Sequence, residues 1–385
     1  MNLSKKKKKS NKIKSLIKSE NITCKNLEKK LYPSSNKDTL LNKLGQGTYG
    51  MAFKGCLKHD CSKYALSVKY VLKKKIYNNY IYKKQLDLTH PAEAEYIMGQ
   101  VLSDLVFRKI TPHINIIHEG INCSYKQLIN SKSLKEKMKH SEISWLNNTG
   151  DLLVKDIIYD DVKITFHELA DTDLKSFILN SNNKLSFLDH VNIFFQFCYT
   201  LASAQYYIPG FRHNDIKPDN ILVKKNVKFK SGMIKYKIVD KNFYIPNTYY
   251  TIKLYDYDFC NSYSIKNQKI INADKNKKSP LRRIGLSSKD NPIYDLHLYI
   301  NFYIKEFNDI LSDKVKKFFY NLIPEINGKK LIGKGGIDNP YLYNYKLTNY
   351  LVTSNRKINF IPPSMKSPIE LLSLIHISEP TRRRT

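Results

Sequence analysis

The chain has 385 residues, of which 42% are apolar, so it can hold two or three domains and is not wholly disordered. Lysine and arginine outnumber aspartate and glutamate by 65 to 34. This excess either attracts polyanions such as nucleic acid, or reflects a general abundance of lysine along the chain. No apolar run approaches the length of a membrane span, so we expect no membrane contact.

The cysteines give an expectation about the cellular compartment. Six of them are scattered along the chain with no signal peptide ahead of them, at Cys24, Cys56, Cys61, Cys123, Cys198 and Cys260. This usage is typical of free thiols in a reducing environment. We therefore expect an intracellular, cytoplasmic protein, with the nucleus as an alternative location.

The amino-terminal residues 1–37 hold twelve lysines and two glutamates, and Lys5 to Lys9 are unbroken. Such a run repels itself, so the sequence predicts a disordered basic tail outside the fold. Nuclear import, or contact with nucleic acid or another polyanion, is the functional alternative.

A G-x-G-x-x-G motif follows, formed by Gly45, Gly47 and Gly50 between Leu44 and Ala52. Such a motif alone can mark a dinucleotide site, but strand-like residues flank it where that site needs a helix. Glycines in a hairpin let backbone N–H groups approach phosphate oxygens closely. The motif therefore favours a phosphate-binding hairpin.

Lys69 lies in the next extended run, residues 64–71. A buried ammonium group needs an anionic partner, whereas a surface lysine needs none. Proline is well placed in the first turn of a helix, so the sequence predicts a helix over 91–107. Glu93 suits the dipole at the start of this helix, and Glu95 is our preferred partner for Lys69.

The middle of the chain alternates irregular and regular segments. Residues 124–160 are polar and predict an insertion or long loop, and residues 162–169 predict a strand. A connector over 170–173 leads towards a core helix that begins with a capping box, Ser186 and Asp189.

The core helix leads to D-x-K-P-x-N, formed by Asp215, Lys217 and Asn220 on a short loop. Aspartate can accept the proton of an attacking hydroxyl, lysine can offset phosphoryl charge, and the asparagine oxygen can bind a hard cation. A polar turn ahead of a strand is the structural alternative. Residues 226–249 then predict a hairpin, and the strand after it ends at Asp256.

In this order, the glycine hairpin, strand lysine, helix glutamate, connector, D-x-K-P-x-N and final acid resemble the eukaryotic-type protein kinases. The divergent kinases of large DNA viruses are the most similar. The resemblance implies an α+β, bilobal fold, with a small β-rich N-lobe at 38–170 and a larger helical C-lobe at 171–371. It implies a serine/threonine protein kinase that uses ATP and Mg²⁺ on protein substrates, in the host cytoplasm or the virion if the chain is viral.

The resemblance also assigns residues to the nucleotide. The three glycines, with their neighbours Leu44 and Ala52, would cover the ATP phosphates. Lys69, paired with Glu95, would hold the inner phosphates. Glu168 and Ala170 would offer backbone groups to adenine, with His167 behind them.

The same resemblance assigns residues to the reaction. Asp215 would be the catalytic base and Lys217 a cation for the phosphoryl group, which favours serine or threonine as the acceptor. Asn220 and Asp256 would be the magnesium ligands. Asp295 resembles the acid that braces the catalytic loop.

Three features depart from the family pattern. Asn214 replaces the arginine that usually precedes the catalytic aspartate, so we do not expect switching by a phosphate in the activation segment. Asp258 replaces the glycine of the metal motif, either as a third metal contact or as a solvated side chain. No Ala-Pro-Glu motif lies between Asp256 and Asp295, which leaves the substrate platform open.

Two other functions remain open at this point: a pseudokinase that only binds, and a small-molecule kinase of the choline or aminoglycoside type. The final residues, 372–385, resemble a translated sequencing adapter, so we expect the natural carboxyl terminus to differ and part of the C-lobe to be missing.

Overall fold

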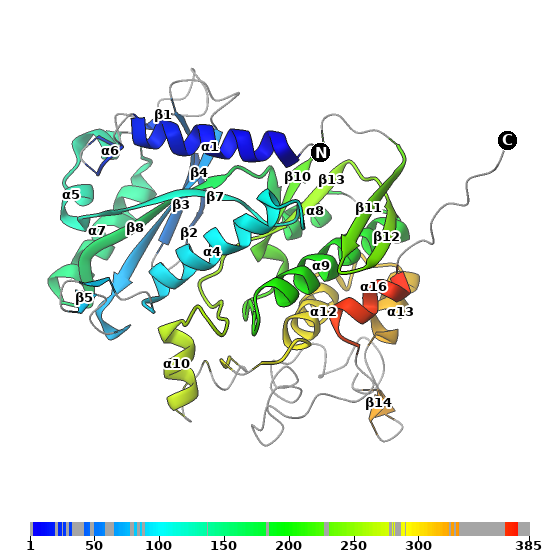
Figure 1. Ribbon diagram of the computed structural model, residues 1–385. Helices are drawn as coiled ribbons and strands as arrows, with labels where there is room; N and C mark the ends of the chain where they lie inside the picture. Colours follow the sequence, from blue (N-terminus) through cyan, green and yellow to red (C-terminus); the bar gives the residue numbers. More distant parts are fainter. Residues whose placement is uncertain are drawn as a thin grey trace. The chain divides into compact units, whose positions relative to one another are not determined.

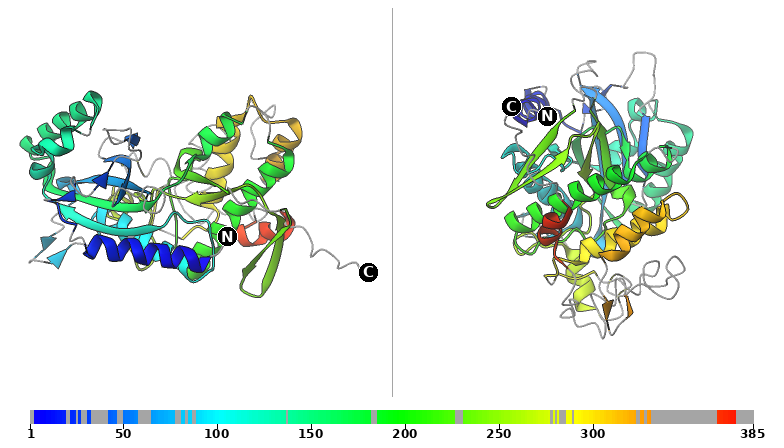
Figure 2. Two further views of the ribbon diagram at one scale, coloured as in Figure 1. Left: turned by 90° about the horizontal axis from the view of Figure 1, so that it is seen from above. Right: turned by 90° about the vertical axis from the view of Figure 1, so that its right-hand side faces the viewer.

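The computed structural model divides the chain into two compact units (Figures 1 and 2). Unit 1 comprises residues 1–107 and 115–170, and unit 2 comprises residues 108–114 and 171–385. Unit 1 is built around a β-sheet and unit 2 is mainly helical, which confirms the predicted α+β, kinase-like fold class. The structure describes residues 3–19, 22–24, 26–27, 31–32, 42–46, 50–57, 65–77, 81–82, 85–86, 89–136, 138–181, 185–226, 231–276, 279, 281, 286–288, 290–322, 325–326, 329–330 and 366–375.

The sheet of unit 1 is antiparallel throughout and has the order β1-β3-β4-β8-β7, with β2 paired to β3. Its strands are β1 (Leu31–Tyr32), β2 (Asn42–Gln46), β3 (Gly50–Leu57), β4 (Ala65–Lys74), β7 (Ile117–Cys123) and β8 (Ile158–Glu168). Buried Tyr70 and Leu72 alternate along β4 with Lys69 and Lys73. Because successive side chains point to opposite faces, the two lysines share the face opposite the tyrosine and leucine. Short strands β5 (Ile81–Tyr82) and β6 (Gln85–Leu86) pair separately.

The amino-terminal stretch is not a disordered tail over residues 3–19, where it forms helix α1 (Leu3–Ser19). This helix contacts β7 and α4 (Pro91–Phe107) within unit 1 (Figure 1). Ile13, Leu16 and Ile17 are buried, at the spacing of one helical face. The prediction of disorder is wrong there because this apolar face packs on the sheet, while Lys8 and other lysines stay exposed.

The polar segment 124–160 is likewise not an irregular insertion. It contains α5 (Tyr125–Ile129), α6 (Lys132–Glu136) and α7 (His140–Val154) before β8 begins. Ser124 caps α5 by accepting the Gln127 N–H, and Leu128 and Leu146 are buried in the core of unit 1. Figure 2 shows these helices and α1 on opposite sides of the sheet. The segment is ordered because its few apolar residues cover a sheet face.

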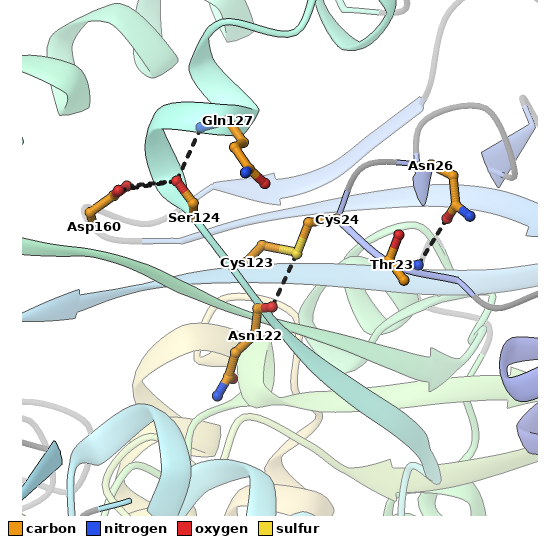
Figure 3. The surroundings of a disulfide bond; sticks show 8 residues. All are labelled: Thr23, Cys24, Asn26, Asn122, Cys123, Ser124, Gln127 and Asp160. Atoms are coloured by element: carbon orange, nitrogen blue, oxygen red, sulfur yellow. Dashed lines mark hydrogen bonds between the residues drawn. A yellow bond between two sulfur atoms is a disulfide. The ribbon is translucent and has the colours of Figure 1, made fainter. Parts of the chain in front are cut away.

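A disulfide joins Cys24, which follows α1, to Cys123 at the end of β7 (Figure 3). Cys56 is also disulfide-bonded, whereas Cys198 and Cys260 are free and buried. The prediction of free thiols is therefore wrong for three cysteines. For Cys24 and Cys123 the reason is that docking of α1 along β7 brings two distant thiols together. The expected intracellular location loses this support and stays a prediction.

Unit 2 is organised around α9 (Phe187–Tyr207), whose predicted capping box between Ser186 and Asp189 is present. The other helices are α8 (Leu174–Leu179), α10 (Gln268–Lys275), α12 (Tyr294–Phe307), α13 (Asp313–Asn321) and α16 (Pro368–Ile375). Buried Leu371 and Leu372 lie in α16, which packs on α9, and the adapter interpretation of 372–385 stays a prediction. None of the helices in the described residues is long and apolar enough to cross a bilayer.

The described strands of unit 2 form three small antiparallel sheets. One has the order β13-β10-β9 and another is the predicted hairpin, β11 paired with β12. Their bounds are β9 (Thr172–Asp173), β10 (Ile221–Lys225), β11 (Met233–Ile238), β12 (Lys241–Pro246) and β13 (Tyr250–Leu254), and the third sheet is β14 (Glu325–Ile326) with β15 (Lys329–Lys330).

A buried ion cluster fixes α4 to the sheet of unit 1. Glu93 in α4 binds the ammonium groups of Lys73 on β4 at 2.7 Å and Lys163 on β8 at 3.0 Å. Lys73 also reaches Asp161 at 2.9 Å. Burial acts to raise the pKa of Glu93, but the two ammonium groups outweigh it and hold that pKa below its ordinary value. Position and register of α4 therefore depend on charge as well as on packing.

We expect Glu93→Gln to lower the free energy of unfolding of unit 1 by about 3–5 kcal/mol, because the amide cannot neutralise two buried ammonium groups. Trp145, the only tryptophan in the chain, is buried in unit 1, so its fluorescence during denaturant unfolding measures this change. Asp156→Asn is the matched control, since Asp156 pairs with Lys75 at the surface and should barely matter. Equal losses in the two variants would contradict a special role of the cluster.

Wild type and Glu93→Gln can also be compared in a pH test. The pKa of Glu93 is lower in the folded state than in the unfolded chain, where it is about 4.3. The ionised Glu93 carboxylate therefore contributes fully to the free energy of unfolding above about pH 4.3, and this contribution is lost as pH falls through the folded-state pKa. Wild type should therefore lose more stability than Glu93→Gln below about pH 4.3. Parallel stability curves for the two proteins would refute this assignment.

Candidate functional site

In unit 1 the predicted hairpin is present as β2 and β3, with Gly45 opposite Ala52 in the register. A side chain at Gly50 would place its Cβ only 2.9 Å from the Tyr70 carbonyl oxygen, so glycine is required by the close approach of β4. Leu44 is 48% exposed. Gly47 lies outside the described residues. The hairpin therefore forms, and contact of its glycines with a phosphate stays a prediction.

Lys69 on β4 binds Glu95 on α4 with an Nζ–Oε1 distance of 2.6 Å. Both side chains are largely buried, with 14% and 7% exposed. The preferred pairing is thus present, and the alternative partner Glu93 is engaged by the ion cluster instead. Ala52 and Thr165 are the cross-strand neighbours of Lys69.

The predicted adenine contacts lie at the end of β8. His167 is buried and its Nε2 is 2.7 Å from the Thr165 hydroxyl. The N–H of Glu168 donates to the Ile116 carbonyl at 2.8 Å, so a base would have to meet another backbone group there. Ala170 is the last residue of unit 1. These positions are half-buried or buried, and their role stays a prediction.

In unit 2 a buried carboxylate holds the loop that carries Asp215. Asp295, in the first turn of α12, accepts the backbone N–H of His213 at 2.7 Å and that of Asn214 at 2.8 Å. Arg212 is fully buried and its guanidinium lies 4.1 Å from the centre of the Tyr294 ring. The brace expected at Asp295 is therefore present, and it sets the backbone directly ahead of Asp215.

Asp215, Lys217 and Asn220 come together on this loop. The Asn220 amide nitrogen donates to the Asp215 carboxylate at 2.7 Å and to its backbone carbonyl at 2.8 Å. The Lys217 ammonium lies 3.6 Å from the same carboxylate. Because the amide nitrogen of Asn220 is used in this way, its Oδ1 is the atom left to serve as a metal ligand.

Asp256 follows β13 and brings a second carboxylate to this site. Its φ is +63°, a left-handed conformation that redirects the chain after the strand. Burial raises the pKa of Asp215, and the Asp256 carboxylate raises it further, against the opposing effects of Lys217 and His213. The pKa of Asp215 is therefore raised although an ammonium group lies beside its carboxylate.

These residues fit a magnesium ion chemically. Asn220 and Asp256 offer oxygen donors, which is the ligand type that this cation prefers. In the described part of the chain, no three His, Cys, Asp or Glu side chains form a metal-holding group. A two-residue set completed by phosphate and water oxygens is the usual arrangement for Mg²⁺.

Asp258 makes a contact that neither expectation named. Its partly exposed carboxylate forms an ion pair with Lys269 in α10, and a role as a third metal contact stays a prediction. Sequence reasoning missed Lys269, and also Asn261, whose side chain bonds Asn214. An Asn267 cap at the start of α10 was the one local signal that a helix presents Lys269 here.

Comparison with known proteins agrees with this geometry. Residues 154–330 match the family model described as poxvirus serine/threonine protein kinase. A protein of Acanthamoeba polyphaga mimivirus, provisionally named a serine/threonine-protein kinase, is 28% identical over 267 residues. That match covers 64% of this chain and 55% of the mimivirus protein, so the chain spans about half the length of this relative. Fold, loop geometry and both matches show that the chain resembles the divergent protein kinases of large DNA viruses.

Proposed function

We propose that the chain transfers the γ-phosphate of ATP to serine or threonine side chains of protein substrates. The observation that carries this proposal is the loop in which Asn220 and Lys217 both contact the Asp215 carboxylate, beside Asp256. Phosphoryl transfer needs mainly alignment and charge neutralisation, and this loop offers a base, a cation and two metal ligands.

The residues of unit 2 would act on the acceptor and the moving phosphoryl group. Asp215 would receive the proton of the substrate hydroxyl, and its raised pKa makes it a better base than an ordinary aspartate. The hydrogen bond that Asn220 donates fixes the orientation of the Asp215 carboxylate. Lys217 would offset charge on the phosphoryl oxygens. Mg²⁺, held by Asn220 and Asp256, would supply further charge neutralisation at the phosphates.

The residues of unit 1 would bind the nucleotide. Lys69 keeps its ammonium ordered through Glu95, which suits contact with phosphate oxygens. The β2–β3 hairpin would cover the phosphates, and backbone groups of Glu168 and Ala170 would meet adenine. These assignments rest on the family resemblance together with the pairing of Lys69.

Transfer from labelled ATP, by wild type and by Asp215→Ala, tests the proposal. We expect the variant to lose about a hundred- to ten-thousandfold in rate, because the substrate hydroxyl loses its base. Asp309→Asn, a change at an exposed carboxylate of unit 2, should keep full activity. Unchanged transfer by Asp215→Ala would remove that residue from its role.

The transfer assay, together with a melting measurement, separates the other two functions. A magnesium-dependent rise in melting temperature with ATP, but no transfer by wild type, would identify a pseudokinase. Phosphorylation of a small alcohol with no labelling of protein would identify a small-molecule kinase. Asp256→Asn should abolish the magnesium-dependent part of the ATP shift.

The pKa of Asp215 gives a pH prediction. The base must be ionised, so kcat/KM should fall as pH drops through a pKa above the ordinary aspartate value of about 3.9. Lys217 lowers this pKa, so Lys217→Met should move the acid limb to higher pH in addition to slowing transfer. Lys314→Met, at an exposed lysine of α13, should leave the limb in place. An unmoved limb in Lys217→Met would contradict the assigned contact.

A further inference from the structure

The residues that follow Asp256 are bonded directly to the catalytic loop. We call residues 256–262 the metal segment. Within it, the amide nitrogen of Asn214 donates to the Phe259 carbonyl at 3.0 Å and to the Asn261 side-chain oxygen at 2.6 Å. Asn214 is buried, so both bonds are sheltered from water. The residue just ahead of the catalytic base therefore holds the segment that carries a metal ligand.

Backbone contacts reinforce this junction. Arg212 and Asn261 exchange two N–H to carbonyl bonds, each with an N–O distance of 3.0 Å, as one isolated antiparallel bridge. Further on, the N–H of Tyr263 donates to the Pro209 carbonyl at 3.0 Å. The metal segment thus runs beside the catalytic loop and ends tied to it.

The Asp258–Lys269 ion pair ties the other side of the metal segment to α10. The Lys269 ammonium also lies 4.6 Å from the centre of the Phe259 ring. Asn267, which caps α10, donates to the carbonyls of Asp258 at 2.8 Å and Cys260 at 3.3 Å. Aspartate at position 258 therefore closes a contact that glycine cannot make.

The residue type at 214 suits both its backbone and its partners. Asn214 has a φ of +65°, in the left-handed region that asparagine adopts more readily than most residues. Its amide supplies the donors that two neighbouring acceptor oxygens require. The arginine of this loop, Arg212, is fully buried against Tyr294, so it does not present its charge to a phosphate in solution.

We propose that Asn214 and the Asp258–Lys269 pair are positioning elements that hold the metal segment in its working conformation without phosphorylation of the chain. The inference deepens the proposed function and rests on it, since it assigns regulation to the same site. In this structure two hydrogen bonds from Asn214 and the ion pair of Asp258 with Lys269 hold the segment.

The decisive variant is Asn214→Asp, which keeps the shape and the backbone preference but replaces both donors with an oxygen. Its new oxygen would face the Phe259 carbonyl and the Asn261 side chain. We expect kcat to fall by about ten- to a hundredfold, with the KM for ATP changed by less than about threefold. Hydrogen exchange at the Asn261 and Tyr263 amides should accelerate by about tenfold or more.

Two further variants complete the design. Asn291→Asp is the matched control, because Asn291 acts through its oxygen on the N–H groups of Ile293 and Tyr294 and the substitution keeps that acceptor. Its kcat and its exchange rates should equal those of wild type. Lys269→Met removes the ion pair while keeping the apolar stem, and it tests the same idea if Asn214→Asp does not fold. We expect it to accelerate exchange across residues 257–260.

Phosphatase treatment tests whether activity needs phosphorylation of the chain. Wild type purified and then dephosphorylated should retain its transfer rate within about twofold. Loss of activity on dephosphorylation would overturn the inference. So would hydrogen-exchange rates and a kcat equal to those of wild type in both Asn214→Asp and Lys269→Met. Either result would leave the kinase proposal intact. Absence of transfer in every preparation would instead refute the proposed function, and exchange alone would then decide whether these residues brace the segment.

Discussion

One buried carboxylate determines where chemistry can occur in unit 2. Asp295 accepts two consecutive backbone N–H groups, those of His213 and Asn214, at a place closed to water. Each of these groups would cost about 1–3 kcal/mol if buried without an acceptor, so this contact stabilises the loop and α12 together. Asp215 follows directly and therefore inherits its position from that contact. The position of Asp215 is therefore set by the fold itself.

Each unit has a cluster of charged side chains around a buried carboxylate, and the pKa of that carboxylate shifts in opposite directions in the two clusters. Around Glu93, two ammonium groups surround a buried carboxylate and its pKa is lowered, which marks an internally satisfied, structural cluster. Around Asp215, burial and the carboxylate of Asp256 outweigh one partly exposed lysine and the pKa is raised. A buried carboxylate whose pKa is raised beside a second carboxylate is the kind of perturbation that clusters at functional sites.

The parts of the fold that the sequence predicts well are those with local causes. Proline at position 91 and the capping box at Ser186 each fix the start of a helix, and both α4 and α9 begin where expected. Helix α1 is not predicted because its lysine run outweighs a narrow apolar face, which packs against β7 and α4 in unit 1. The bond between Cys24 and Cys123 joins positions 99 residues apart, and spacing alone cannot specify such a pairing.

The site itself shows where motif comparison stops being informative. A motif compares one position at a time, so Asn214 and Asp258 register as losses of an arginine and a glycine. In the folded chain Asn214 bonds the metal segment, and Asp258 finds a cation in Lys269, eleven positions further on. No local sequence pattern predicts these partners, because each pair forms only when the loop that carries Asp215, the metal segment and α10 come together in the fold. Missing motif residues argue for a pseudokinase only when no other contact holds the segment, and here Asn214 and Asp258 both bond to it or to α10.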